Sequence, residues 1–175
     1  MMTLQGKRII AFVEDDFEDL ELWVPVMRLR EEGAEVLLTG KENGKSYTGK
    51  HGVPAVSEAA LADVDPADYD GVLVPGGWAP DKLRRYSEVL SIVRHMDEHK
   101  KIIGEICHAG WVLSSAGILQ GVHVTSTPGI KDDMTNAGAV WSDDPVVVDG
   151  HIVSSQRPPD IPAYNQALVE AFRTQ

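Results

Sequence analysis

The sequence predicts an α/β fold in which a mostly parallel sheet carries helices on both faces. Along the 175 residues, short apolar runs that suit buried strands alternate with segments whose apolar residues recur at helical spacing. Near the middle, the apolar run before Cys107 passes through small residues into a helical pattern. A strand–turn–helix unit of this kind can hold a nucleophile at its apex.

The elements follow from these patterns in chain order. Apolar runs predict strands at residues 9–13, 35–39, 69–74, 102–106 and 122–126. Helical spacing predicts helices at residues 17–33, 81–98 (as one or two helices), 108–116, 131–137 and 163–173, with a weaker helical stretch at 57–63. Residues 40–56 suit a loop with a short hairpin, and 146–154 suit a hairpin that turns at Asp149-Gly150. The first helix has an apolar stripe formed by Phe17, Leu20, Val24 and Met27, and Pro25 is expected to kink it.

Length and composition predict one soluble domain spanning residues 1–175. Apolar residues make up 43% and charged residues 25%, which is ordinary for a globular protein. The net charge of −11 and the absence of a basic patch argue against nucleic-acid binding. Since no apolar run approaches the roughly 20 residues of a membrane span, and a single cysteine forms no internal disulfide, a cytoplasmic location is expected.

Cys107 is the candidate nucleophile. Its place at a strand-to-helix turn brings the backbone N–H groups of the new helix near the side chain, where they can favour a thiolate or an oxyanion. An isolated cysteine is more often a small buried apolar residue, but the adjacent His108 and the turn favour catalysis. His108 could act as a general base or stabilise the thiolate, and the alternative is that it packs at the helix start.

Unusual residues follow three of the predicted strands: 14–18, 75–77 and Cys107-His108. In parallel sheets, ligands bind outside the carboxyl ends of the strands, so we expect these segments to form one site. Gly76 and Gly77 could be turn residues, could present backbone N–H groups to an oxyanion, or could do both.

Two acidic residues near this site are candidates for chemistry. Glu18 belongs to the acidic run 14–19, whose default explanation is favourable charge at a helix N-terminus. It could also face the cysteine as a protonated hydrogen-bond donor, although spacing alone does not select it among the five acids. Glu105 lies in a strand that should be buried, so its carboxyl needs a partner, such as a histidine or arginine across the sheet or at an interface. The histidines show no ligand spacing, and no metal site is expected.

Several motifs in order along the chain resemble the PfpI-type intracellular cysteine protease family, whose superfamily includes protein deglycases of the glyoxalase III type. They are Glu18-Asp19 with Glu21-Leu22, residues 49–52, residues 74–77, Ile106-Cys107-His108, residues 115–117, residues 131–134 with 136–138, and residues 148–150 with Ser154-Ser155. The resemblance runs essentially from end to end.

This resemblance implies a flavodoxin-like three-layer sandwich, related to class I glutamine amidotransferase domains, with Cys107 as nucleophile at the elbow. It further implies Glu18 as the carboxyl beside the cysteine, His108 as the second catalytic residue, and an oxyanion site at backbone N–H groups near Gly77 and His108. A carboxylate from a neighbouring subunit, at the position of Asp81, would complete a triad in a dimer or hexamer. An aromatic hydroxyl common in the family is replaced here by Thr127, and no cofactor is implied.

The leading functional hypothesis is a stress-response cysteine hydrolase or lyase that acts on small reactive aldehydes or on their protein adducts. The thiol of Cys107 would add to the aldehyde group of the substrate and form a hemithioacetal. The alternatives are an intracellular cysteine peptidase, which uses the same thiolate on an amide, and a redox sensor or chaperone that uses reversible oxidation of Cys107. A glutamine amidotransferase is disfavoured because the usual histidine and glutamate pair is absent near the C-terminus.

Overall fold

The computed structural model describes residues 3–175, so residues 1 and 2 of the predicted domain lie outside the described residues. Its main sheet has seven strands in the order β10-β11-β7-β6-β1-β2-β5. These strands are β1 (Arg8–Phe12), β2 (Glu35–Gly40), β5 (Ala59–Ala60), β6 (Gly71–Val74), β7 (Ile102–Ile106), β10 (Val146–Asp149) and β11 (Ile152–Ser155). All neighbours are parallel except β10 and β11, which form the predicted antiparallel hairpin.

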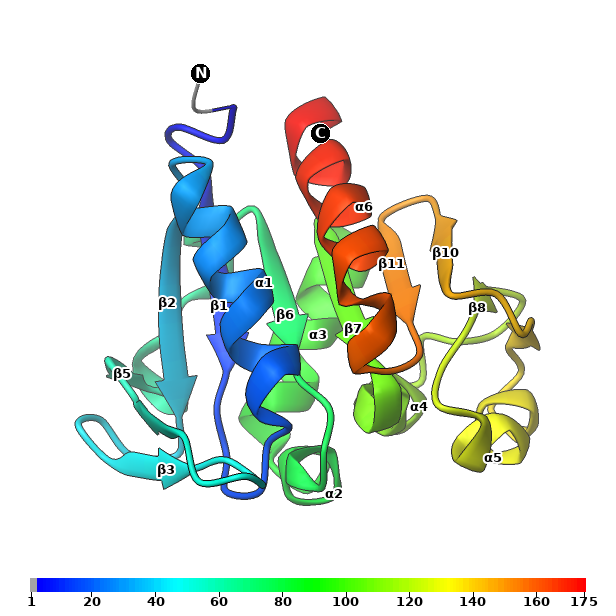
Figure 1. Cartoon of the computed structure of the whole chain (residues 1–175), viewed down its shortest axis with the longest axis horizontal. Coiled ribbons are helices and arrows are strands. Elements are labelled where there is room, and N and C mark those ends of the chain that lie inside the picture. Colours follow the sequence, from blue (N-terminus) through cyan, green and yellow to red (C-terminus); the bar gives the residue numbers. More distant parts are fainter. Residues whose placement is uncertain (1–2) are drawn as a thin grey trace.

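Helices cover both faces of this sheet. They are α1 (Asp19–Glu31), α2 (Ala79–Leu83), α3 (Ser87–Glu98), α4 (Gly110–Ala116), α5 (Lys131–Asn136) and α6 (Ile161–Thr174). In Figure 1, α1 and α6 lie in front of the sheet and α3 lies behind it, where it packs against α4. The predicted α/β sandwich with a mostly parallel sheet is therefore confirmed.

The centre of the sheet is buried on both faces, as its sequence predicts. β6 and β7 are buried along their whole lengths, and so are residues 9–12 of β1. Because β7, β6 and β1 are adjacent and parallel, their carboxyl ends meet at one edge of the sheet, at the bottom of Figure 1.

Three predicted elements differ in detail from the observed ones. Residues 57–63, expected as a weak helix, form the edge strand β5 and a short 3-10 helix, Leu61–Asp63. The Thr39 hydroxyl donates to the Ala59 carbonyl and helps to hold that edge strand to β2. The strand expected at 122–126 shortens to β8 (His123–Val124), which pairs with β9 (Val140–Trp141) in a separate small sheet. The predicted hairpin within 40–56 is present as β3 (Ser46–Thr48) and β4 (Pro54–Val56).

Only part of the apolar stripe predicted for the first helix is buried. Leu20 and Met27 are 52% and 61% exposed, whereas Leu22, Val26 and Leu29 are buried against the sheet. Two apolar stripes run along this helix, and periodicity alone does not say which of them faces the core. The correct stripe brings Glu21, next to Leu22, onto the buried side.

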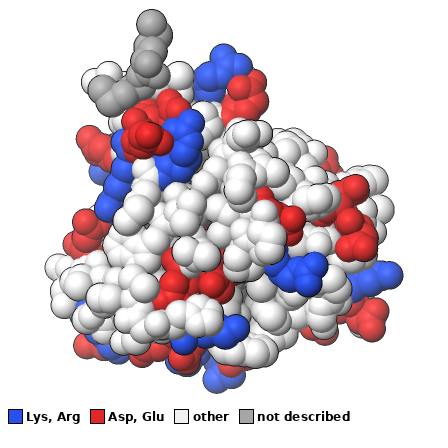
Figure 2. Space-filling model, viewed as in Figure 1, with Lys and Arg blue, Asp and Glu red and all other residues white. Residues whose placement is uncertain are grey.

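Charged side chains of both signs are interspersed over the face of the molecule seen in Figure 2. Across residues 3–175, no helix is both long and apolar enough to cross a membrane.

Candidate active site

Two loops at the carboxyl ends of β1 and β6 are joined by backbone hydrogen bonds. The Glu18 N–H donates to the Gly76 carbonyl at 3.1 Å, and the Trp78 N–H donates to the Asp16 carbonyl at 2.8 Å. Between them, Phe17 and Gly77 form an isolated β-bridge. These contacts hold the two predicted strand-end segments side by side, next to the end of β7.

Cys107 lies at a strained turn between β7 and the helical segment that leads into α4. Its φ of 65° is a left-handed value that few residues other than glycine adopt in the described chain. A short 3-10 helix, Cys107–Ala109, follows at once and continues as α4. This geometry is the predicted elbow, and it leaves the Cys107 side chain 8% exposed.

The thiol opens into a pocket of about 290 Å³. Its walls come from α1, from the β3–β4 turn, from the loops after β6 and β7, and from the segments before α5 and α6. They comprise Glu18, Glu21, Lys50, His51, Gly77, Trp78, Cys107, His108, Thr127, Arg157 and Pro158. A larger pocket of about 500 Å³ lies between β10 and α6, near the opposite ends of the strands, but holds no nucleophile. The smaller pocket is therefore the candidate active site.

His108 is held beside the sulfur. Its Nδ1 lies 3.3 Å from Cys107 Sγ, and its ring packs beside those of Trp78 and Trp111, each with its centroid 5.0 Å away. Burial, and to a lesser extent the charge of Lys50, lower the pKa of His108. A neutral imidazole at this distance can accept the thiol proton, which suits a general base.

The carboxyl that faces the thiol belongs to Glu21 rather than to Glu18. It lies where the absent side chain of Gly76 leaves room, since a Cβ on Gly76 would overlap the Glu21 carboxylate and approach Cys107 Cβ to 2.6 Å. Burial raises the pKa of Glu21 to about 8, and the charge of Glu18 adds to this, while the thiol and the Gly76 backbone act in the opposite direction. Neither carboxyl oxygen reaches ordinary hydrogen-bond geometry.

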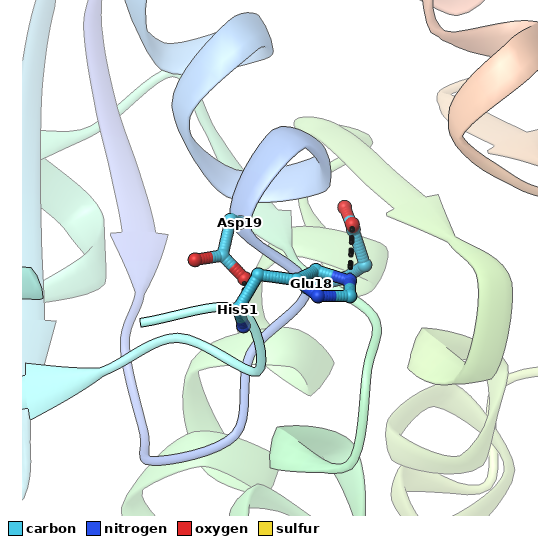
Figure 3. Close-up of side chains that lie close together, drawn as sticks. All are labelled: Glu18, Asp19 and His51. Atoms are coloured by element: carbon cyan, nitrogen blue, oxygen red, sulfur yellow. Dashed lines mark hydrogen bonds and ion pairs between the residues drawn. The ribbon is translucent and has the colours of Figure 1, made fainter. Parts of the chain in front are cut away.

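Glu18 instead caps the start of α1. Its Oε2 accepts a hydrogen bond from the Glu21 N–H at 2.8 Å, and its Oε1 lies 3.7 Å from His51 Nε2. Figure 3 shows this pair with the neighbouring Asp19, which points to the other side of His51. Glu18 thus lines the pocket but does not take the position expected for it beside the sulfur.

Asp19 fastens the β3–β4 turn to α1. Its two carboxylate oxygens accept the N–H groups of His51 and Val53, each at 2.8 Å. Ligand atoms of Glu18, Asp19 and His51 all lie within 4.8 Å of one another, close enough for one metal ion. Both carboxylates are already engaged by backbone N–H groups, so the capping of α1 by Glu18 and the anchoring of the turn by Asp19 account for the cluster without an ion.

The buried position of Cys107 favours the protonated thiol over the thiolate. Burial raises the pKa of Cys107 to about 12, and the carboxylate charge of Glu21 contributes. The backbone N–H groups of Gly77 and His108 face the sulfur and lower its pKa, but by less. A base must therefore take the proton when the substrate arrives.

Glu105, two residues before the nucleophile, is completely buried. Its register partners are Val74 in β6 and Ser154 in β11. Neither of its oxygens has a hydrogen-bond partner, and burial raises the pKa of Glu105 well above its ordinary value. Among residues 3–175 no histidine or arginine pairs with it across the sheet, which leaves a partner at a subunit interface as the remaining form of the prediction.

The remaining predicted residues divide into two groups. Thr127 lines the pocket, and its N–H donates to the Cys107 carbonyl at 3.2 Å. Asp81 lies on the short helix α2, forms an ion pair with Arg85, and does not line the pocket of its own chain.

Comparison with known proteins identifies the family. The family model described as DJ-1/PfpI matches residues 7–171. The chain belongs to the DJ-1/PfpI family. The resemblance on the motifs around Cys107 is thereby confirmed.

Relatives in the DJ-1/PfpI family match nearly the full length of the chain. The chain is 42% identical to the protein named Deglycase PH1704 of Pyrococcus horikoshii, over 95% of this chain and 99% of that one. It is 39% identical to Putative cysteine protease YraA of Bacillus subtilis, over 96% and 99% of the two chains. These names support an enzymatic activity for this chain.

Solved structures show the same DJ-1/PfpI fold. A two-domain protein from Anabaena variabilis with DJ-1/ThiJ/PfpI-like and ferritin-like domains superposes with a TM-score of 0.92 at 31% identity. The match covers 94% of this chain and 48% of that one, so this chain corresponds to about half of the two-domain protein.

Sequence reasoning missed several residues of this DJ-1/PfpI site, among them Glu21, Lys50 and Arg157. A signal for Glu21 was present, because a carboxylate on the same helix face as Leu22, Val26 and Leu29 must be buried. Lys50 and Arg157 lie on segments whose distance from Cys107 is set by the tertiary fold, and no local pattern marks them.

Proposed function

We propose that this chain is a cysteine-dependent enzyme that converts small reactive dicarbonyls, or the adducts they form with proteins, into 2-hydroxy acids. The observation that carries the proposal is the contact of 3.3 Å between Cys107 Sγ and His108 Nδ1 inside a pocket of about 290 Å³. Relatives named as deglycases support the same class of reaction.

The first step is addition of the thiol to the aldehyde. As Sγ forms its bond to the aldehyde carbon of methylglyoxal, His108 Nδ1 takes the thiol proton and the carbonyl electron pair moves to oxygen. The backbone N–H groups of Gly77 and His108, which face the sulfur, are positioned to stabilise the oxyanion. Return of the proton from His108 to this oxygen gives a neutral hemithioacetal.

The second step moves a proton between carbons. Neutral His108 takes the proton from the carbon bound to sulfur, and the bonding pair forms a double bond to the neighbouring keto carbon, whose oxygen takes the displaced electron pair. That carbon then receives the proton from His108, and the hydroxyl proton of the hemithioacetal passes to the former keto oxygen, which yields a thioester of lactate. Water then attacks the thioester, the carbon–sulfur bond breaks, and the thiol regains its proton. The net reaction adds one water molecule to methylglyoxal and releases lactate.

Glu21 is proposed to assist the sulfur throughout this cycle. With its pKa raised to about 8, it is largely protonated at neutral pH, so it adds no negative charge and can hold its proton towards the developing thiolate. Glu18 has a supporting function at the start of α1, where it caps the helix that carries Glu21.

Lactate formation from methylglyoxal, without added glutathione, tests the proposal. We expect turnover by the wild-type protein and none by Cys107→Ala, which removes one small atom and should fold normally. Circular dichroism spectra that superpose would confirm that the variant is folded. Equal lactate formation by the two folded proteins would remove Cys107 from the reaction and refute the proposal.

A peptidase is the second candidate because one relative is named as a putative cysteine protease. The same thiol would attack an amide, and protonated His108 would deliver its proton to the departing amine. The small pocket favours a small carbonyl substrate over an extended peptide. A redox sensor has less support, since the buried, protonated thiol of Cys107 reacts slowly with oxidants.

We also propose that the chain forms homo-oligomers in which Asp81 reaches His108 of a neighbouring copy. Two features support self-association: the exposed position of Asp81 on α2, and the exposed side chains of Leu20 and Met27 on α1. An apolar stripe on a helix surface is a common element of subunit interfaces.

A further inference from the structure

Two cationic side chains of the described chain have no partner, and both line the pocket of Cys107. Lys50 and Arg157 take part in no side-chain hydrogen bond, ion pair or aromatic contact among residues 3–175, and both contribute to the pocket wall. Every other lysine and arginine donates a hydrogen bond, pairs with a carboxylate or lies over an aromatic ring.

This distribution is unexpected for so acidic a chain. Because the chain has 27 acidic residues and 16 basic ones, a carboxylate is usually available to pair with a lysine or arginine. The other lysines and arginines of the described chain do have partners. The two exceptions come from turns far apart in sequence, one between β3 and β4 and one after β11. Their coincidence at the nucleophile indicates that the partner they lack is the ligand of this pocket.

The backbone holds both cations in place. The Lys50 N–H donates to the Phe17 carbonyl at 2.7 Å, and Asp19 fixes the next part of the same turn. Arg157 directly precedes the rigid pair Pro158-Pro159, and its carbonyl accepts the Asp160 N–H at 2.9 Å. The charge of Lys50 reaches the reacting groups, since it contributes to the lowered pKa of His108.

The acidic groups of the pocket do not cancel these charges. Burial keeps Glu21 largely neutral at pH 7 through its pKa of about 8. The Glu18 carboxylate is turned to the start of α1 and to His51. Lysine and arginine are the side chains that bind carboxylate and phosphate oxygens most strongly, arginine through two parallel hydrogen bonds.

We propose that the substrate of this pocket carries an anionic group, a carboxylate or a phosphate, that Lys50 and Arg157 bind while Cys107 attacks its carbonyl carbon. The inference rests on the proposed function for the attack at carbonyl carbon, but the anion preference can be measured without it. In this proposal Lys50 and Arg157 determine which substrates bind. The function proposed above gives these two residues no role.

A matched pair of alkylating reagents measures this preference directly. Iodoacetate and iodoacetamide have nearly the same size, and only the first is an anion; in both reactions Sγ bonds to the methylene carbon and iodide leaves with the bonding electron pair. Because Cys107 is the only cysteine, the rate of modification reports on this pocket alone. The ratio of the two rates at one pH, divided by the same ratio for a small free thiol, gives the preference for an anion.

We expect this normalised ratio to be at least about tenfold above one for the wild-type protein, as charge-assisted hydrogen bonds would provide. Lys50→Gln and Arg157→Gln should each reduce it, while Lys131→Gln, a change on exposed α5, should leave it at the wild-type value. The alkylation of Cys107 is then repeated with added inorganic phosphate or added acetate. The anion that slows the alkylation more is the one that the pocket prefers.

A wild-type ratio equal to that of the free thiol would overturn the inference, and this result is expected if a neighbouring copy's carboxylates neutralise the two cations. A high ratio that both glutamine variants retain would also overturn it. Lactate formation from neutral methylglyoxal, measured on the same preparations, reports on the proposed function separately. A protein with an anion-selective thiol and no lactate formation would refute the proposed function while supporting the anion site.

Discussion

At the scale of single residues, burial and backbone contacts separate the acids around Cys107 into two kinds. Glu21 and Glu105 are buried without hydrogen-bond partners, and burial raises the pKa of each. Glu18 and Asp19 instead accept backbone N–H groups and fix the chain near the pocket. Sequence reasoning identified the acidic run but not this division, because the identity of the buried acid depends on which face of α1 meets the sheet.

The buried pair predicts a stability that falls as pH rises. A carboxyl whose pKa is higher in the folded than in the unfolded state stabilises the fold below its unfolded pKa, and that contribution is lost as pH increases towards the folded pKa. For Glu21 this contribution is lost between about pH 4.5 and about pH 8. For Glu105 the loss begins at the same pH and continues to higher pH, because burial raises its pKa well above the ordinary value.

We therefore expect Glu105→Gln, which keeps the shape and stays neutral, to be more stable than the wild-type protein at pH 8 by at least about 1 kcal/mol. The two proteins should differ little near pH 5. Urea unfolding at both pH values measures this, with Glu98→Gln on the exposed end of α3 as the matched control. Parallel stability curves for wild type and Glu105→Gln would show that Glu105 is not kept neutral by the fold.

At the scale of elements, the sequence predicted the arrangement of the site better than its chemistry. The strand ends carrying residues 14–18, 75–77 and Cys107-His108 converge as expected, because adjacent parallel strands end at one edge of the sheet. Weak sequence patterns predicted the wrong element where tertiary contacts determine the secondary structure. Residues 57–63 form the edge strand β5 and a 3-10 turn instead of the expected helix. Lys50 could not be placed near Cys107 from sequence, since the β3–β4 turn is held at the pocket by tertiary contacts, among them those of Asp19 and of the Phe17 carbonyl.

Asp19 joins α1 to that turn, so its loss should affect both stability and binding. Removing a buried carboxylate that accepts two N–H groups is expected to lower the free energy of unfolding by about 3 kcal/mol in Asp19→Ala. The loosened turn carries Lys50 and His51, so KM should rise more than kcat falls.

Urea unfolding and steady-state kinetics check both parts of this prediction, with Asp132→Ala on the exposed first turn of α5 as control. A stability change in Asp19→Ala no larger than that of the control would show that Asp19 does not anchor the turn.

At the scale of the whole molecule, the open question is whether one chain contains the complete site. Asp81 is paired with Arg85 on the surface of α2 and is not part of the pocket of its own chain. If Asp81 acts on a neighbouring copy, Asp81→Ala should lower turnover by about tenfold or more and leave the alkylation rate of Cys107 nearly unchanged.

Mixing experiments distinguish action between copies from action within one. Asp81→Ala and Cys107→Ala each lack one component, so a mixed oligomer should regain part of the lost activity after subunits exchange. No recovery in a mixture that demonstrably exchanges subunits would confine Asp81 to its own chain, and full activity of Asp81→Ala would remove it from the mechanism.

The most direct test concerns which carboxyl serves the nucleophile. We would measure kcat for lactate formation from methylglyoxal by Glu21→Gln and Glu18→Gln beside the wild-type protein. Glu21→Gln should lose about 100-fold or more, as expected for a group that moves or holds a proton at the reacting sulfur. Glu18→Gln retains an oxygen that can cap α1 and should stay within about tenfold of wild type. The opposite ranking, with Glu18→Gln inactive and Glu21→Gln close to wild type, would contradict the assignment of Glu21 to Cys107.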